Sequence, residues 1–143
     1  GYGDVEEIIN KGMTALSPDI FESIANEQGA LVLDARPPQV FKDAFIPNAI
    51  NIGINGDFAP WVGTLITDIR QPILLITEAG KEEEVVTRLS RVGYDNTLGF
   101  LEGGIEAWKQ AGKEIDSLLS ISAEDFAARL KAQPEAIVKD VRK

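Results

Sequence analysis

The chain has 143 residues, of which 44% are hydrophobic, and this is enough apolar material for one domain with a core of its own. Its formal net charge is −9, from 23 acidic and 14 basic residues, which argues against nucleic acid and anionic membranes as partners. The chain contains no cysteine and no histidine. Disulfides, cysteine nucleophiles, histidine-based triads and ordinary zinc sites are therefore excluded for this chain.

The expected elements follow one another with clear start and stop signals. Ser17 and Pro18 open a helix that Gly29 ends, and glutamates begin and arginines close the helix over 80–92. Short apolar runs bounded by Gly and Pro are typical of buried parallel strands. We expect helices over 5–11, 18–28, 37–41, 57–65, 80–92 and 105–110, and strands over 30–34, 49–52, 72–76 and 96–101.

This alternation of strands and helices predicts an α/β fold. The sheet should be mainly parallel, with about five strands and helices on both faces. No apolar run approaches the roughly 18 residues of a membrane span, and no signal-peptide pattern opens the chain. Because a chain without cysteine suits a reducing compartment, we expect a cytoplasmic location.

The end of the sequence echoes its beginning. Residues 121–126 repeat the pattern of 16–21, and residues 137–142 repeat that of 31–36, including the Asp-x-Arg. Chance similarity is one explanation, and a tandem repeat cut off after its first strand is the one we favour. We then expect a linker helix at 1–15 from a missing N-terminal domain, one domain at 16–117, and the start of a second at 118–143.

The tail at 118–143 is too small for a core of its own. We expect Phe126 and Leu130 to be buried against the first domain or a neighbouring molecule. The apolar strand at 137–141 should pair with an existing sheet edge.

Three segments together resemble the rhodanese family. Residues 31–36 resemble its first strand with the Asp-x-Arg signature, residues 45–52 resemble its His-Ile-Pro-Gly-Ala-Ile-Asn-Ile segment, and residues 101–108 resemble its Gly-Gly-x-x-x-Trp ending. The resemblance spans about 16–116 and implies a rhodanese-like fold. Its signature positions in this chain are Asp34, Arg36, Gly103, Gly104 and Trp108.

These signature residues also have physical interpretations of their own. Asp34 and Arg36 follow a strand, where they either tie loops together or form an exposed surface pair. The glycines at 103 and 104 allow a tight turn from strand to helix. Trp108 is expected to be a packing residue in the core or at its rim.

The loop after the third predicted strand decides the chemistry. In active rhodaneses, the resemblance implies a Cys-x-x-Gly-x-Arg loop that holds the thiolate in a ring of backbone amides at a helix N-terminus. Here the glycine is kept, while a threonine replaces the cysteine, a glutamate replaces the arginine, and Phe45 replaces the family's histidine. The degenerate loop consists of Thr77, Glu78, Ala79, Gly80, Lys81 and Glu82.

The replaced loop is expected to be inactive. A threonine hydroxyl is far less acidic than a thiol and cannot carry transferable sulfur. Glutamates at 78, 82, 83 and 84 should repel thiosulfate, phosphate or persulfide, with only Lys81 nearby to oppose them. We therefore expect a rhodanese-like loop backbone that binds no anion, and no sulfurtransferase activity.

The resemblance also extends to a known arrangement of domains. Bacterial fusions join a metallo-β-lactamase-fold persulfide dioxygenase or hydrolase to two rhodanese-like domains. In this interpretation the chain is a non-catalytic spacer and interaction module of a multidomain sulfur-metabolism protein. It needs no metal or cofactor of its own, and its partners are the neighbouring domains or a second copy in a homo-oligomer.

Two other functions remain open at this point. One is a free-standing regulatory module that reads a partner through the acidic rim of the degenerate loop. The other is an enzyme that uses carboxylates, with Glu78 or Glu82 and Asp34 as an acid–base pair. That last function needs a buried carboxyl group with a raised pKa.

Overall fold

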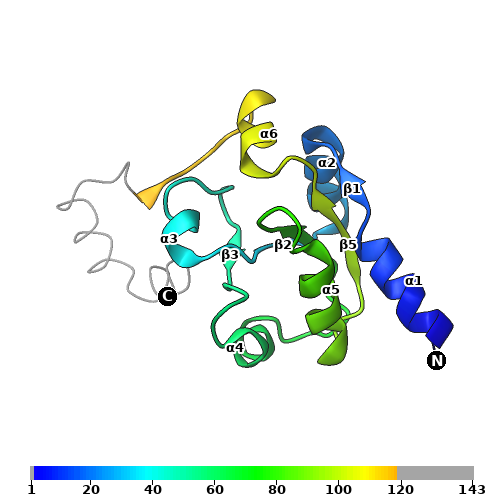
Figure 1. Cartoon of the computed structure of the whole chain (residues 1–143). Coiled ribbons are helices and arrows are strands. Elements are labelled where there is room, and N and C mark those ends of the chain that lie inside the picture. Colours follow the sequence, from blue (N-terminus) through cyan, green and yellow to red (C-terminus); the bar gives the residue numbers. More distant parts are fainter. Residues whose placement is uncertain (1, 119–143) are drawn as a thin grey trace.

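The computed structural model describes residues 2–118, in which five parallel strands form one sheet with the order β1-β5-β4-β2-β3. Figure 1 shows this sheet between its helices. The expected α/β class and parallel sheet are therefore confirmed. The strands are β1 (Ala15–Leu16), β2 (Leu31–Asp34), β3 (Ile50–Asn51), β4 (Ile73–Ile76) and β5 (Thr97–Leu101).

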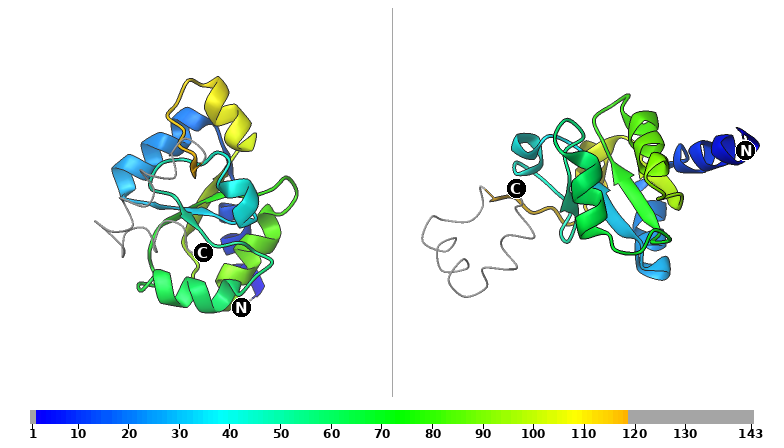
Figure 2. Two further views of the ribbon diagram at one scale, coloured as in Figure 1. Left: turned by 90° about the vertical axis from the view of Figure 1, so that its left-hand side faces the viewer. Right: turned by 90° about the horizontal axis from the view of Figure 1, so that it is seen from below.

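Helices cover both faces of the sheet, as Figures 1 and 2 show. The side chains of α1, α4 and α5 pack with Leu33, Ile73 and Leu75 into one core. Those of α2, α3 and α6 pack with Leu74 and Ile76 into the other. The helices are α1 (Tyr2–Gly12), α2 (Pro18–Gln28), α3 (Pro38–Phe41), α4 (Phe58–Leu65), α5 (Glu82–Arg91) and α6 (Gly104–Gln110).

The position of β4 at the centre of the sheet explains why its residues form an unbroken apolar run. Successive side chains of a strand point to opposite faces of the sheet. All four residues of β4 are completely buried, because each of the two faces carries a core. A strand covered on both sides cannot alternate apolar with polar residues.

Capping residues set the ends of α2 as the sequence predicts. The Ser17 hydroxyl accepts a hydrogen bond from the Ile20 amide at 3.4 Å. Gly29 ends the helix with φ of 62°, and its amide donates to the Ala25 carbonyl. Glycine reaches this left-handed conformation without steric cost.

The strand that the sequence did not predict is β1. Two backbone hydrogen bonds hold this segment beside β5. The amides of Phe100 and Glu102 donate to the carbonyls of Thr14 and Leu16 at 2.9 and 2.8 Å. Two residues are too few to show a period-2 pattern. The domain boundary expected after residue 15 therefore falls inside a strand of the sheet.

The helix before this strand also contacts the domain. Ile9 of α1 packs against the core formed with α5. At the end of α1, a Cβ atom on Gly12 would lie 2.8 Å from both Val86 methyl groups, so the α1 backbone packs directly against the Val86 side chain there. That α1 also links to a preceding domain remains a prediction.

Predictions for the tail lie outside the residues that the structure describes. These are the start of a second domain after residue 118, the burial of Phe126 and Leu130, and the edge strand at 137–141. Within residues 2–118, no helix combines the length and the apolar character needed to cross a membrane.

Candidate functional site

The degenerate loop connects β4, the most buried strand, to the amphipathic helix α5. Strand β4 ends at Ile76 and α5 begins at Glu82. Between them, the Lys81 amide donates to the Glu78 carbonyl at 3.1 Å and closes a turn. Gly80 has φ of 86°, a conformation that favours glycine. The helix expected from residue 80 therefore starts two residues later.

Thr77 lies half-buried at the start of this loop. Its hydroxyl donates a hydrogen bond to the Glu78 carbonyl at 2.8 Å. A peptide carbonyl does not accept a proton near neutral pH, so this contact does not activate the hydroxyl. A hydroxyl nucleophile needs an adjacent general base, and the chain has no histidine to provide the usual one.

Negative charge dominates around the loop. Glu78 and Glu83 are exposed, and Glu82 is half-buried at the first position of α5. Glu84 lies 3.0 Å from Arg88 and 3.8 Å from Lys81, so the two nearest cations already have a carboxylate partner. The glutamates suit the positive end of the helix dipole, and they leave little attraction for a second anion.

The signature pair Asp34 and Arg36 is buried, not exposed. Asp34 has no exposed surface and Arg36 is 8% exposed. The guanidinium binds both carboxylate oxygens, with Nη2 2.7 Å from Oδ2 and Nε 2.9 Å from Oδ1. The same Nη2 donates to the Ala44 carbonyl at 2.7 Å. The pair thereby joins the end of β2 to the segment before β3.

Asn51 completes this connection from the neighbouring strand. Its side-chain Nδ2 donates to the carbonyls of Asp34 and Arg36, both at 2.9 Å. The sequence predicts a strand at Asn51 but does not indicate this role of its side chain. A polar residue between isoleucines in a buried strand is the signal that was available, because a buried amide needs partners.

Another Asp-x-Arg, at Asp68 and Arg70, makes the same backbone hydrogen bond at the surface. The Arg70 amide donates to Asp68 Oδ1 at 2.9 Å, as the Arg36 amide donates to Asp34 Oδ1 at 3.1 Å. Burial raises the pKa of the Asp34 carboxyl, although Arg36 opposes that effect. The pKa of Asp68 is lowered, chiefly by the hydrogen bond from the Arg70 amide. The surroundings of the carboxyl group, and not the Asp-x-Arg motif, determine whether its pKa is raised or lowered.

The buried geometry of Asp34 argues against the hypothesis of an enzyme that uses carboxylates. Asp34 has the raised pKa that an acid–base residue requires, but both of its oxygens contact Arg36 and none of its surface is exposed. Glu78 lies exposed in the loop, and Glu82 is half-buried at the start of α5. An acid–base residue must reach the proton that it moves, so this pair does not form an open reaction centre.

The closing signature forms a turn and a packing site. Gly103 and Gly104 have φ of 79° and 64°, and a Cβ atom on Gly103 would lie 2.7 Å from that of Ala107. Trp108 is buried, meets Phe21 edge-on at 5.8 Å, and donates from Nε1 to the Glu114 carbonyl at 2.7 Å. These residues build α6 and its contact with α2.

Phe45, which the resemblance sets in place of a histidine, also packs against a neighbouring ring. Its ring stacks on Phe41 at 4.4 Å, and its backbone forms an antiparallel bridge with Asp116. Within residues 2–118, no group of three or more aspartates and glutamates lies close enough to hold a metal ion.

Sequence relatives contain this domain within longer proteins. The adenylyltransferase and sulfurtransferase uba4 of Pyricularia oryzae is 30% identical over 119 residues, which cover 70% of this chain and 24% of that protein. An uncharacterized protein of Buchnera aphidicola is 26% identical over 86 residues, covering 60% of this chain and 58% of the relative. The chain thus spans less than two thirds of both relatives.

Solved structures share the fold. The Alr3790 protein from Anabaena aligns with a TM-score of 0.62 at 19% identity, covering 89% of this chain and 97% of that one. Thiosulfate sulfurtransferase from Pseudomonas aeruginosa also aligns with a TM-score of 0.62 at 19% identity, covering 81% of this chain and 22% of that enzyme. The family model for the rhodanese-like domain matches residues 17–111. By this match, which includes the degenerate loop and every signature residue, the chain belongs to the rhodanese-like domain family.

Proposed function

We propose that this rhodanese-like domain transfers no sulfur itself and serves as a spacer and interaction module in a multidomain sulfur-metabolism protein. The observation that carries this proposal is the content of the loop at 77–82. Its first residue offers a hydroxyl bound to a backbone carbonyl, and its sixth offers a carboxylate. Sulfur transfer needs a thiolate and a site that tolerates anions.

The multidomain part of the proposal draws on the relatives. One of them is named as both an adenylyltransferase and a sulfurtransferase, and this chain spans only 24% of it. We infer that the domain works beside catalytic domains of the same protein. A metallo-β-lactamase-fold hydrolase or persulfide dioxygenase is the neighbour that we propose, acting in the cytoplasm. The fragment itself would need no cofactor.

A second function has one observation in its favour. Glu78, Ala79, Gly80 and Lys81 are all exposed, so the degenerate loop presents itself to solvent. A free-standing regulatory module would use this acidic rim to bind a partner. In that case, charge reversal in the loop would weaken partner binding, whereas a spacer would tolerate it.

Restoring the missing groups tests the proposal for the loop. We expect Thr77→Cys alone to give little thiosulfate sulfurtransferase activity, because Glu82 still repels the anionic donor. The double variant Thr77→Cys with Glu82→Arg should produce thiocyanate faster than either single variant. Thr64→Cys is the matched control, because it adds a thiol at an exposed position of α4 away from the loop.

The comparison among variants also exposes a wrong account. Equal rates for both single variants and the double variant would refute the electrostatic role given to Glu82. Activity of Thr64→Cys at the level of the double variant would show that any thiol suffices. Activity in the unmodified chain would overturn the non-catalytic role.

A further inference from the structure

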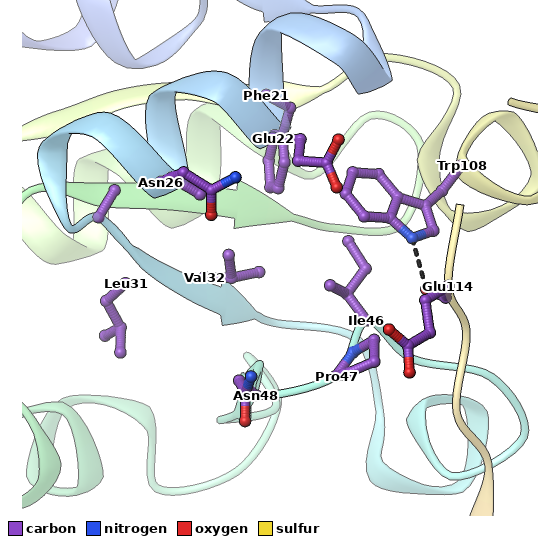
Figure 3. Close-up of a pocket in the computed structure, with 12 residues that line it drawn as sticks. Phe21, Glu22, Asn26, Leu31, Val32, Ile46, Pro47, Asn48, Trp108 and Glu114 are labelled. Atoms are coloured by element: carbon purple, nitrogen blue, oxygen red, sulfur yellow. Dashed lines mark hydrogen bonds between the residues drawn. The ribbon is translucent and has the colours of Figure 1, made fainter. Parts of the chain in front are cut away.

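A hollow of about 400 Å³ lies on the face of the sheet that carries α2 and α6. Figure 3 shows it between α2, β2, the segment at 46–48 and the turn after α6. No residue of the degenerate loop lines it. The lining residues share an apolar floor and a polar rim: Phe21, Glu22, Ala25, Asn26, Ala30, Leu31, Val32, Ile46, Pro47, Asn48, Trp108 and Glu114.

The helices on this face leave part of β2 uncovered beside α2. The opposite core is built with α1, α4 and α5, whereas this face carries α2, α6 and the four-residue α3. Val32 of β2 is only half-buried on this face, as Leu31 is against the other core, although the neighbouring strand β4 is completely buried. An apolar surface of the sheet is left available beside α2.

The floor offers no free hydrogen-bonding side chain. Phe21, Ile46 and Trp108 are buried beneath the hollow, and the Trp108 Nε1 already donates to the Glu114 carbonyl. An apolar group is therefore the only occupant that the floor can bind without leaving a polar atom unpaired. Ligand sites of this kind combine an apolar interior with a few polar groups that fix orientation.

The rim is acidic. Glu22, Asn26, Asn48 and Glu114 are exposed, and none of the residues that line the hollow is basic. The nearby Lys113 is held by Asp19 at 2.8 Å and by Glu22 at 2.7 Å, with its Nζ 5.7 Å from the centre of the Trp108 ring. The carboxylates at this rim outnumber the one lysine, so the hollow favours positive charge.

We infer that this hollow binds a segment of a partner polypeptide in which an apolar side chain is flanked by lysine or arginine. The apolar side chain would enter the floor, and the flanking cations would meet Glu22 and Glu114. A polypeptide fits better than a small free amine, because the exposed polar side chains lie at the rim and the floor holds no unpaired polar side-chain group. This inference rests on the interaction role proposed above and names the surface that performs it.

The test uses a blocked pentapeptide with a central leucine, glycine on each side and lysine at both ends. Binding is followed by the indole N–H signal of Trp108 in ¹H–¹⁵N NMR spectra of the full chain. Trp61→Phe assigns that signal, because the chain has two tryptophans. We expect a saturable shift that weakens as salt is raised.

Matched peptides and variants identify what is recognised. Replacing the leucine with glycine, or the lysines with glutamates, should abolish the shift. Glu114→Gln should weaken binding about twofold to fivefold, the range for an exposed ion pair. Glu27→Gln, which removes an exposed carboxylate of α2 outside the hollow, should change nothing.

Each other outcome overturns the inference. Equal binding of the glycine peptide would show that the floor is not used, and equal weakening by Glu27→Gln would show only general attraction to an acidic protein. An equal shift with hexylammonium would assign the hollow to a free amine. Sulfur transfer by the unmodified chain would refute the proposed function and leave peptide binding intact, so the two failures are distinguishable.

Discussion

Two Asp-x-Arg pairs within residues 2–118 separate the effect of a motif from the effect of its surroundings. Asp34 with Arg36 and Asp68 with Arg70 share the same spacing and the same hydrogen bond from the arginine amide. The first pair is buried under the segment before β3, and the second has an Arg70 side chain that is 88% exposed. The sequence did not predict which pair is buried, because the Asp-x-Arg motif is the same in both places.

This difference should appear in stability. Arg36→Met leaves the buried Asp34 carboxylate without its cation, and we expect the free energy of unfolding to fall by about 3–5 kcal/mol. Arg70→Met is the matched control and should leave stability unchanged, because exposed ion pairs contribute little. Urea unfolding of both variants measures this. Equal losses would show that burial does not distinguish the pairs.

The same contrast predicts two opposite pH dependences around the ordinary aspartate pKa of 3.8. The pKa of Asp34 is raised, so its contribution to stability is present below 3.8 and is lost as the pH rises through the native pKa. The pKa of Asp68 is lowered, so its contribution is present above 3.8 and is lost as the pH falls through the native pKa. Carboxyl ¹³C chemical shifts during a pH titration report both groups. The account is wrong if Asp34 titrates at a lower pH than Asp68.

At the scale of elements, one short strand shows how tertiary contacts decide what local pattern cannot. Strand β1 exists because its carbonyl groups meet the amides of β5, and a close approach at Gly99 permits this. A Cβ atom on Gly99 would lie 2.7 Å from the Thr14 carbonyl oxygen and 2.7 Å from a Leu16 methyl group. A real side chain cannot occupy that space without moving β1.

We therefore expect Gly99→Ala to reduce the free energy of unfolding by about 1–3 kcal/mol, the usual effect of overpacking. Gly63→Ala is the control in helix α4, where a Cβ atom would meet nothing within 4 Å. That change should raise stability by about 0.5–1 kcal/mol, because alanine favours helices over glycine. Thermal unfolding compares the two. A neutral Gly99→Ala would mean that β1 is not held this closely.

Other elements were predictable where the sequence carries explicit signals. The start of α2 follows from a serine cap, its end from Gly29, and the buried strand β4 from four consecutive apolar residues. The start of α5 was predicted two residues early, because the left-handed backbone at Gly80 is invisible in a hydrophobic pattern. Helix-end signals locate a boundary only as well as they identify the capping residue.

At the scale of the whole molecule, different sets of helices cover the two faces of the sheet. Three helices pack on each face, and the face with α2, α3 and α6 leaves the hollow beside α2. The sequence pattern indicated helices on both faces, but it did not indicate how fully each face is covered. Residues such as Asn48 and Glu114 are far apart in the chain, and only the fold brings them to one rim.

The degenerate loop, in contrast, is predicted from the sequence alone, because its expected chemistry depends on residue types and not on distances. A chain without cysteine cannot form a protein persulfide at any position. The structure adds that the Thr77 hydroxyl faces a carbonyl group and that nearby cations are engaged by Glu84.

We propose that this domain transfers no sulfur, and a thiosulfate–cyanide assay of the unmodified chain tests this most directly. Thiocyanate should form no faster than in buffer alone, at protein concentrations where thiosulfate sulfurtransferase from Pseudomonas aeruginosa gives a clear rate. Thiocyanate production above the buffer rate that increases with the concentration of this chain would contradict the account.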